Sequence, residues 1–123
     1  MKILVTDDSK MARKMVIKTL TEILGENVEI HEATNGQEAL DLYKQLLPNI
    51  VFLDLTMPVM DGFEALEKIK EFDNKAKVVV ISADIQKLSM DKALQLGAFN
   101  FVKKPIDSEK MGQILNKING LDK

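Results

Sequence analysis

The stretch that decides the fold of this chain runs from Ile50 to Gly62 and reads IVFLDLTMPVMDG. Its five apolar residues and Asp54 follow one another without a turn residue, so we expect a strand that is buried on both faces. Met57-Pro58 and Asp61-Gly62 then break the run. Because a carboxylate at the end of a buried strand is costly unless something uses it, we interpret Asp54 as a functional residue.

Short apolar runs alternate with amphipathic segments on both sides of this stretch. We expect strands at residues 3–5, 28–33, 50–54, 78–81 and 99–102. We expect helices at about 9–24, 39–47, 63–72, 85–96 and 111–118. Strict alternation of strands and helices favours parallel strands joined by right-handed crossovers. The sequence therefore predicts an α/β fold, an open sheet with helices on both faces.

The first expected helix has recognisable end signals, with Ser9 as N-cap and Gly25 as C-terminal stop. Its expected inner face consists of apolar residues at three- and four-residue steps: Ala12, Val16, Leu20 and Ile23. Met11 and Met15 are interpreted as packing residues of the same helix. Further along, Asn35-Gly36 is interpreted as a turn.

Composition limits the classes of protein to consider. The chain has 123 residues, 46% of them hydrophobic, which fits one domain over residues 1–123. Its 17 basic and 19 acidic residues are mixed along the chain, so we expect no direct nucleic-acid binding. It has no cysteine, and no apolar run approaches the ~20 residues that span a bilayer. We therefore expect a cytoplasmic protein without a membrane partner.

Polar residues follow four of the five expected strands. They are Asp7 and Asp8 after the first strand, Asp54 on the third, Ser82 on the fourth and Lys104 just past the fifth. In open parallel sheets, ligands bind outside the carboxyl ends of the strands, and neighbouring strands are only about 4.8 Å apart. If the first, third, fourth and fifth strands are neighbours in that order, these five side chains share one shallow pocket.

Three carboxylates in one pocket require a cation. Two of them about 4 Å apart repel by about 4 kcal/mol at an effective dielectric near 20. Since the candidate ligands are all oxygens, Mg²⁺ fits best, and Lys104 would add a second positive charge. A carboxylate nucleophile, a divalent metal and a lysine together indicate phosphoryl transfer, to which the Ser82 hydroxyl can contribute a hydrogen bond.

In these residues the chain resembles a response-regulator receiver domain over essentially its whole length. The matching pairs are Asp7-Asp8, Met57-Pro58 and Asp61-Gly62 after Asp54, Ser82-Ala83 and Lys104-Pro105. The resemblance implies a flavodoxin-like doubly wound fold of five strand–helix units, with strand order 2-1-3-4-5. No G-x-G-x-x-G or G-x-x-x-x-G-K-[ST] motif occurs, which argues against nucleotide binding.

The resemblance also implies a role for each site residue. Asp54 would accept a phosphoryl group from a sensor histidine kinase, and Lys104, with a cis bond to Pro105, would contact that group. The metal ligands would be Asp7, Asp8, Asp54 and the backbone carbonyl of Thr56, with Asp7 acting partly through water. Ser82 and Phe101 would form the switch, although phenylalanine lacks the hydroxyl that tyrosine carries there in some members.

These features predict a stand-alone response regulator of a two-component system, with chemotaxis and flagellar motor control as the expected role. It would be a phosphoacceptor that assists its own phosphorylation and dephosphorylation, and not otherwise an enzyme. Its target would bind the fourth helix, fifth strand and fifth helix. We expect a monomer and leave dimerisation on activation open.

Three alternatives stay open on the sequence alone. A phosphorelay intermediate or phosphate sink would use the same residues. An adaptor of the same fold that never carries phosphate would be expected to lose at least one of the five pocket residues. An aspartyl-nucleophile phosphatase is a third class, but those enzymes usually carry the nucleophile on the first strand, with a second acid two residues on.

Overall fold

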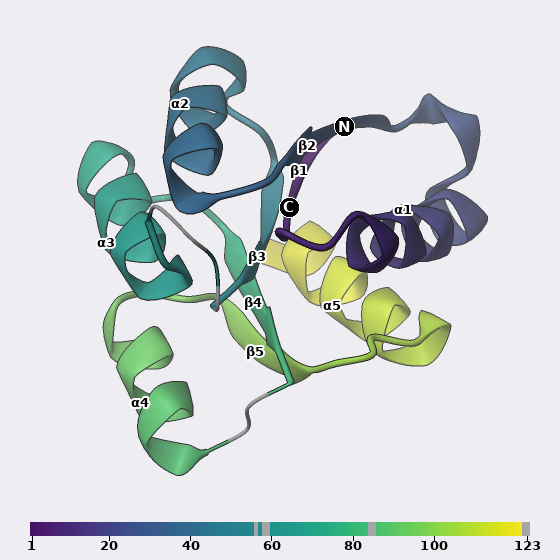
Figure 1. Cartoon of the computed structure of the whole chain (residues 1–123). Coiled ribbons are helices and arrows are strands. Elements are labelled where there is room, and N and C mark those ends of the chain that lie inside the picture. Colours follow the sequence, from purple (N-terminus) through teal and green to yellow (C-terminus); the bar gives the residue numbers. More distant parts are fainter. Residues whose placement is uncertain (56, 58–59, 84–85, 122–123) are drawn as a thin grey trace.

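The computed structural model of the chain describes residues 1–55, 57, 60–83 and 86–121. In these residues, five parallel strands form one sheet in the order β2-β1-β3-β4-β5, as predicted (Figure 1). The strands are β1 (Lys2–Thr6), β2 (Glu29–Ala33), β3 (Ile50–Asp54), β4 (Val78–Ser82) and β5 (Asn100–Lys103). The helices are α1 (Lys10–Leu24), the short 3-10 helix η1 (Gly25–Asn27), α2 (Gly36–Leu46), α3 (Gly62–Phe72), α4 (Lys87–Gln95) and α5 (Ser108–Leu121).

The sheet is covered on both sides, by α1 and α5 on one face and by α2, α3 and α4 on the other (Figure 1). Alternate residues of each strand point to opposite faces, so each central strand contributes to two apolar layers. Ile50 and Phe52 pack on the α1 and α5 side, whereas Val51 and Leu53 pack on the other. This double burial explains why β3 and β4 are buried along their whole length.

The ends of α1 agree with the prediction. The Ser9 hydroxyl accepts a hydrogen bond from the Ala12 backbone N–H at 3.2 Å, and Gly25 ends the helix with a φ of 75°. Asn35-Gly36, predicted as a turn, is instead the start of α2. The Asn35 side chain accepts a hydrogen bond from the Glu38 backbone N–H at 2.9 Å, because asparagine caps a helix as readily as it forms a turn.

The interpretation of Met11 and Met15 as packing residues was wrong. Their exposed fractions are 74% and 55%, because at 100° per residue they lie opposite the buried stripe that contains Val16 and Leu20. Ile23, predicted on the inner face, is 39% exposed, and in the last turn it is Leu24 that packs, partly buried, against the apolar layer. Within the described part of the chain, no helix is long and apolar enough to cross a bilayer.

Candidate phosphoryl-transfer site

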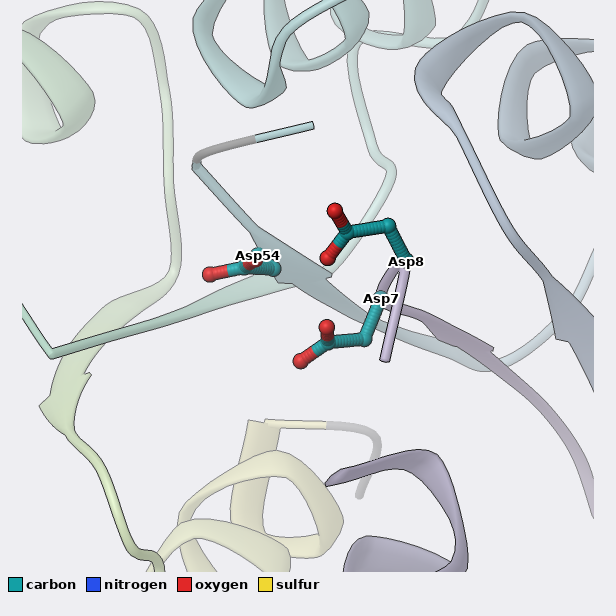
Figure 2. Close-up of side chains that lie close together, drawn as sticks. All are labelled: Asp7, Asp8 and Asp54. Carbon is teal, nitrogen blue, oxygen red and sulfur yellow. The ribbon is translucent and has the colours of Figure 1, made fainter. Parts of the chain in front are cut away.

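The carboxyl ends of β1 and β3 bring three aspartates together. Thr6 of β1 pairs with Leu53 of β3, so the next residues, Asp7 and Asp54, follow side by side. Each of Asp7, Asp8 and Asp54 has a carboxylate oxygen within 4.8 Å of those of the other two. Figure 2 shows the three carboxyl groups directed to the same side of the two strand ends. Asp7 and Asp54 are buried and Asp8 is exposed, so the cluster lies open to solvent on the Asp8 side.

Lys104 supplies the positive charge of the cluster. Its Nζ lies 2.7 Å from Asp7 Oδ2 and 3.4 Å from Asp54 Oδ1. The backbone N–H of Lys104 donates a hydrogen bond to the Ser82 carbonyl at 2.9 Å, which anchors the loop after β5 to the end of β4. The Lys104–Pro105 peptide bond is cis, as the resemblance implied. One ammonium therefore neutralises part of the charge of two buried carboxylates.

Burial and charge act in opposite directions on these groups. Burial raises the pKa of Asp54, the charge of Asp7 raises it further, and Lys104 lowers it without reversing the shift. For Lys104, burial acts to lower the pKa, but the hydrogen bond to Asp7 and the charge of Asp54 raise it overall. The aspartates thus carry more negative charge than Lys104 compensates, which favours the binding of a cation.

The other predicted site residues are Ser82, Phe101 and Thr56, and the first two are located by their positions in the sheet. Ser82 is the last residue of β4 and is buried, one position beyond Ile81, the register partner of Asp54. It therefore lies at the same edge of the sheet as the aspartates. Phe101 lies within β5, pairs with Val80 and packs partly buried against the apolar layer beneath α2 and α3. Thr56 lies outside the described residues, so its part in the site stays a prediction.

Gly62 shapes the site without contributing a functional group. Its backbone N–H donates to the Leu55 carbonyl at 2.9 Å, which folds the start of α3 back against the end of β3. A Cβ at this position would lie 2.3 Å from the carbonyl oxygen of Asp54. Only glycine allows this close approach, so Asp61-Gly62 is more than a strand breaker. Asp61 is the N-cap of α3, accepting from the Glu64 backbone N–H at 2.9 Å.

Arg13 is a site neighbour that the sequence reasoning missed. It is 9% exposed and lies on the inner face of α1, seven residues before Leu20. Its Nη1 donates to the backbone carbonyl of Asp7 at 2.7 Å. The signal available in the sequence was a basic residue at an inward position of an amphipathic helix, since a buried arginine requires partners.

Comparison with known proteins defines the family of this chain. The model of the response regulator receiver domain matches residues 3–116. The chain is 38% identical over 122 residues to the chemotaxis protein CheY of Thermotoga maritima, covering 96% of this chain and 97% of that protein. It is 43% identical over 113 residues to CheY of Treponema pallidum, covering 89% and 76%, respectively.

A solved structure gives the same result for the fold. It is the CheX–CheY–BeF3–Mg²⁺ complex from Borrelia burgdorferi, with a TM-score of 0.88 and 36% identity over 96% of this chain and 88% of that one. The chain therefore belongs to the response regulator receiver domain family, with receivers of the CheY type among its relatives. The flavodoxin-like fold predicted from the resemblance is confirmed.

Proposed function

We propose that this chain is a response regulator that accepts a phosphoryl group on Asp54 from a phosphohistidine of a sensor kinase. The observation that carries this proposal is the position of Asp54, buried at the end of β3 with Lys104 Nζ 3.4 Å from its Oδ1. One carboxylate oxygen of Asp54 attacks phosphorus as the phosphorus–nitrogen bond to the histidine breaks. The electron pair of that bond leaves with the imidazole, and Lys104 stabilises negative charge on the transferred oxygens.

The acidic cluster fits Mg²⁺. Its donor set consists of carboxylate oxygens, which this ion prefers, and the exposed side of Asp8 leaves room for the waters that it keeps. Asp8 and Asp54, with the Thr56 carbonyl, would hold the ion, which supplies neutralisation of charge on the phosphoryl oxygens. Asp7 is less free to bind directly, because its Oδ1 accepts from the Ser9 N–H at 2.9 Å and its Oδ2 from Lys104 at 2.7 Å. A contact of Asp7 through water is the arrangement that these bonds support.

We assign the signalling step to Ser82 and Phe101 and the output surface to α4, β5 and α5. Phosphorylation would bias a two-state equilibrium through these residues, and a partner that prefers one state would read it. Chemotaxis is the proposed context, supported by the similarity to CheY proteins over most of their length. The CheY of Borrelia burgdorferi forms a complex with CheX, which makes a protein of that kind one candidate partner here.

The test is phosphorylation by acetyl phosphate and Mg²⁺, followed by intact-mass spectrometry. We expect the wild-type chain to gain the mass of one phosphoryl group and Asp54→Asn to gain none. Asp41→Asn is the matched control, because Asp41 is an exposed aspartate of α2 that is not a member of the carboxylate cluster. Incorporation into Asp54→Asn at the wild-type level would refute the assignment.

A phosphorelay intermediate would share this chemistry and differ only in its acceptor. It is identified by onward transfer from phosphorylated Asp54 to a histidine of a second protein. The purely structural adaptor is disfavoured because Asp7, Asp8, Asp54 and Lys104 are all present and lie together. The aspartyl phosphatase is disfavoured because the buried candidate nucleophile is on β3, not on β1.

A further inference from the structure

Arg13 connects the loop that carries Asp7 and Asp8 to strand β2. Its guanidinium makes two hydrogen bonds in different directions, from Nη1 to the Asp7 carbonyl at 2.7 Å and from Nε to Glu32 Oε1 at 2.9 Å. Glu32 belongs to β2, so one side chain of α1 joins the end of β1 to its sheet neighbour. The planar guanidinium suits this task, since its donors point in fixed directions.

The backbone of Asp7 is held on both sides. Its N–H donates to the Ala33 carbonyl of β2 at 3.1 Å, and its carbonyl accepts from Arg13. That carbonyl belongs to the peptide group that leads into Asp8. Because a peptide group is planar, fixing its carbonyl fixes the direction in which the chain enters Asp8. Asp8 itself is exposed, so its direction depends on how the backbone on either side of it is held.

We propose that Arg13 is a positioning residue that sets the affinity of the acidic cluster for Mg²⁺. By holding the Asp7–Asp8 peptide group, it directs the Asp8 carboxylate toward Asp54. Glu32 in turn holds the guanidinium at the correct angle. This inference rests on the proposed function, because it takes Asp8 and Asp54 as the ligands of the ion.

Two possible effects of Arg13 on Mg²⁺ binding have opposite signs. As a positive charge near the cluster, Arg13 repels a cation, so its removal would tighten binding if charge alone mattered. As a positioning residue, it lowers the cost of bringing the carboxylates together, so its removal weakens binding. The direction of the change in affinity therefore distinguishes the two roles.

The experiment is a calorimetric titration of Mg²⁺ into the wild-type chain, Arg13→Met, Arg13→Lys and Lys14→Met. Lys14 is the matched control, since it is the next residue of the same helix and is exposed. We expect Kd to rise about tenfold in Arg13→Met, the scale seen when an outer partner of a metal ligand is removed. Arg13→Lys should have a Kd between those of the wild type and Arg13→Met, because an ammonium lacks the forked donors that reach both partners. Lys14→Met should stay within about twofold of wild type, as suits a screened surface charge.

A second measurement needs no metal. In ¹H–¹⁵N spectra of the metal-free protein, the amide signals of Asp8 and Ser9 should move in Arg13→Met and remain in place in Lys14→Met. A merely structural role for Arg13 would lower the melting temperature while leaving these local signals and the Kd of the folded protein unchanged.

Unchanged or tighter Mg²⁺ binding in Arg13→Met overturns the inference. If Arg13→Met does not fold, Arg13→Lys decides, and a Kd equal to that of wild type overturns the inference in the same way. Failure of the wild-type chain itself to bind Mg²⁺ refutes the proposed function instead. The two failures are therefore distinguishable.

Discussion

Lys104 Nζ lies 2.7 Å from Asp7 Oδ2, although the two residues are 97 positions apart in the chain. The parallel sheet makes this contact possible, because the ends of β1 and β5 lie at the same edge. Lys104 is thereby held where it also reaches Asp54. The contact holds the Lys104 ammonium in the position that the proposed reaction needs before any phosphoryl group arrives.

Replacing Lys104 should remove most of the reactivity of Asp54. We expect Lys104→Met to slow phosphorylation by acetyl phosphate about 10²-fold, the effect typical of losing one charge-stabilising donor. Lys103→Met is the control, since Lys103 is the exposed lysine directly before Lys104 and is not part of the Lys104–Pro105 cis peptide bond. Stopped reactions analysed by intact mass give the rates. Equal rates for the two variants would mean that Lys104 only balances charge in the resting site.

The charge of Asp54 should cost folding stability, because burial and Asp7 raise its pKa. A carboxyl whose pKa is raised on folding is disfavoured in its charged form, so the cost is present at pH 7 and disappears as the pH falls below about 4. We expect Asp54→Asn to raise Tm by roughly 3–5 °C at pH 7 in the presence of a chelator, and by less at pH 4. Thermal melts by circular dichroism measure this.

Asp73→Asn is a control for which we expect the opposite change in Tm. The pKa of Asp73 is lowered by its hydrogen bond from Tyr43 and by the Lys75 backbone N–H. Its charged form therefore stabilises the fold above the ordinary pKa of aspartate, and that stabilisation is lost as the pH falls. We expect Asp73→Asn to lower Tm at pH 7. A decrease in Tm for Asp54→Asn as well would contradict the electrostatic account of the site.

Gly62→Ala should disturb the link between β3 and α3. The added Cβ would meet the Asp54 carbonyl oxygen at 2.3 Å, and backbone atoms cannot move aside as a flexible side chain can. We expect a loss of about 1–3 kcal/mol in the free energy of unfolding, the usual range for overpacking. Gly112→Ala is the control, because nothing lies within 4 Å of its Cβ position in α5. That variant should gain about 0.5–1 kcal/mol from helix propensity. Urea denaturation compares the two.

Tyr43 joins α2 to the end of α3. Its hydroxyl donates a 2.7 Å hydrogen bond to Asp73 Oδ2, and burial together with that bond raises its pKa. We expect Tyr43→Phe to lower the free energy of unfolding by about 1–2 kcal/mol. A double-mutant cycle with Asp73→Asn isolates the pair, and additive effects would show that the bond contributes little.

The sequence by itself determined the order and approximate positions of the strands and helices and the residues at the strand ends, although α2 and α5 begin three residues before their predicted starts. The reason is that local sequence patterns reflect burial, as in the continuous apolar run of β3. Caps such as Ser9 likewise act within one helical turn. The same reasoning placed Asp7, Asp8, Asp54, Ser82 and Lys104 at one edge, because parallel strands end together. The strand order itself came from the resemblance and not from periodicity.

Only the tertiary structure decided which of these groups touch and which surfaces remain exposed. Whether Lys104 bonds to Asp7 at 2.7 Å, or Arg13 to the Asp7 carbonyl, depends on sheet register and side-chain conformation across elements distant in sequence. Met11 and Met15 show that apolar character alone does not decide burial, because both lie on the side of α1 opposite the stripe that packs on the sheet. Local pattern encodes the elements, whereas contacts between them are set by how the whole chain packs.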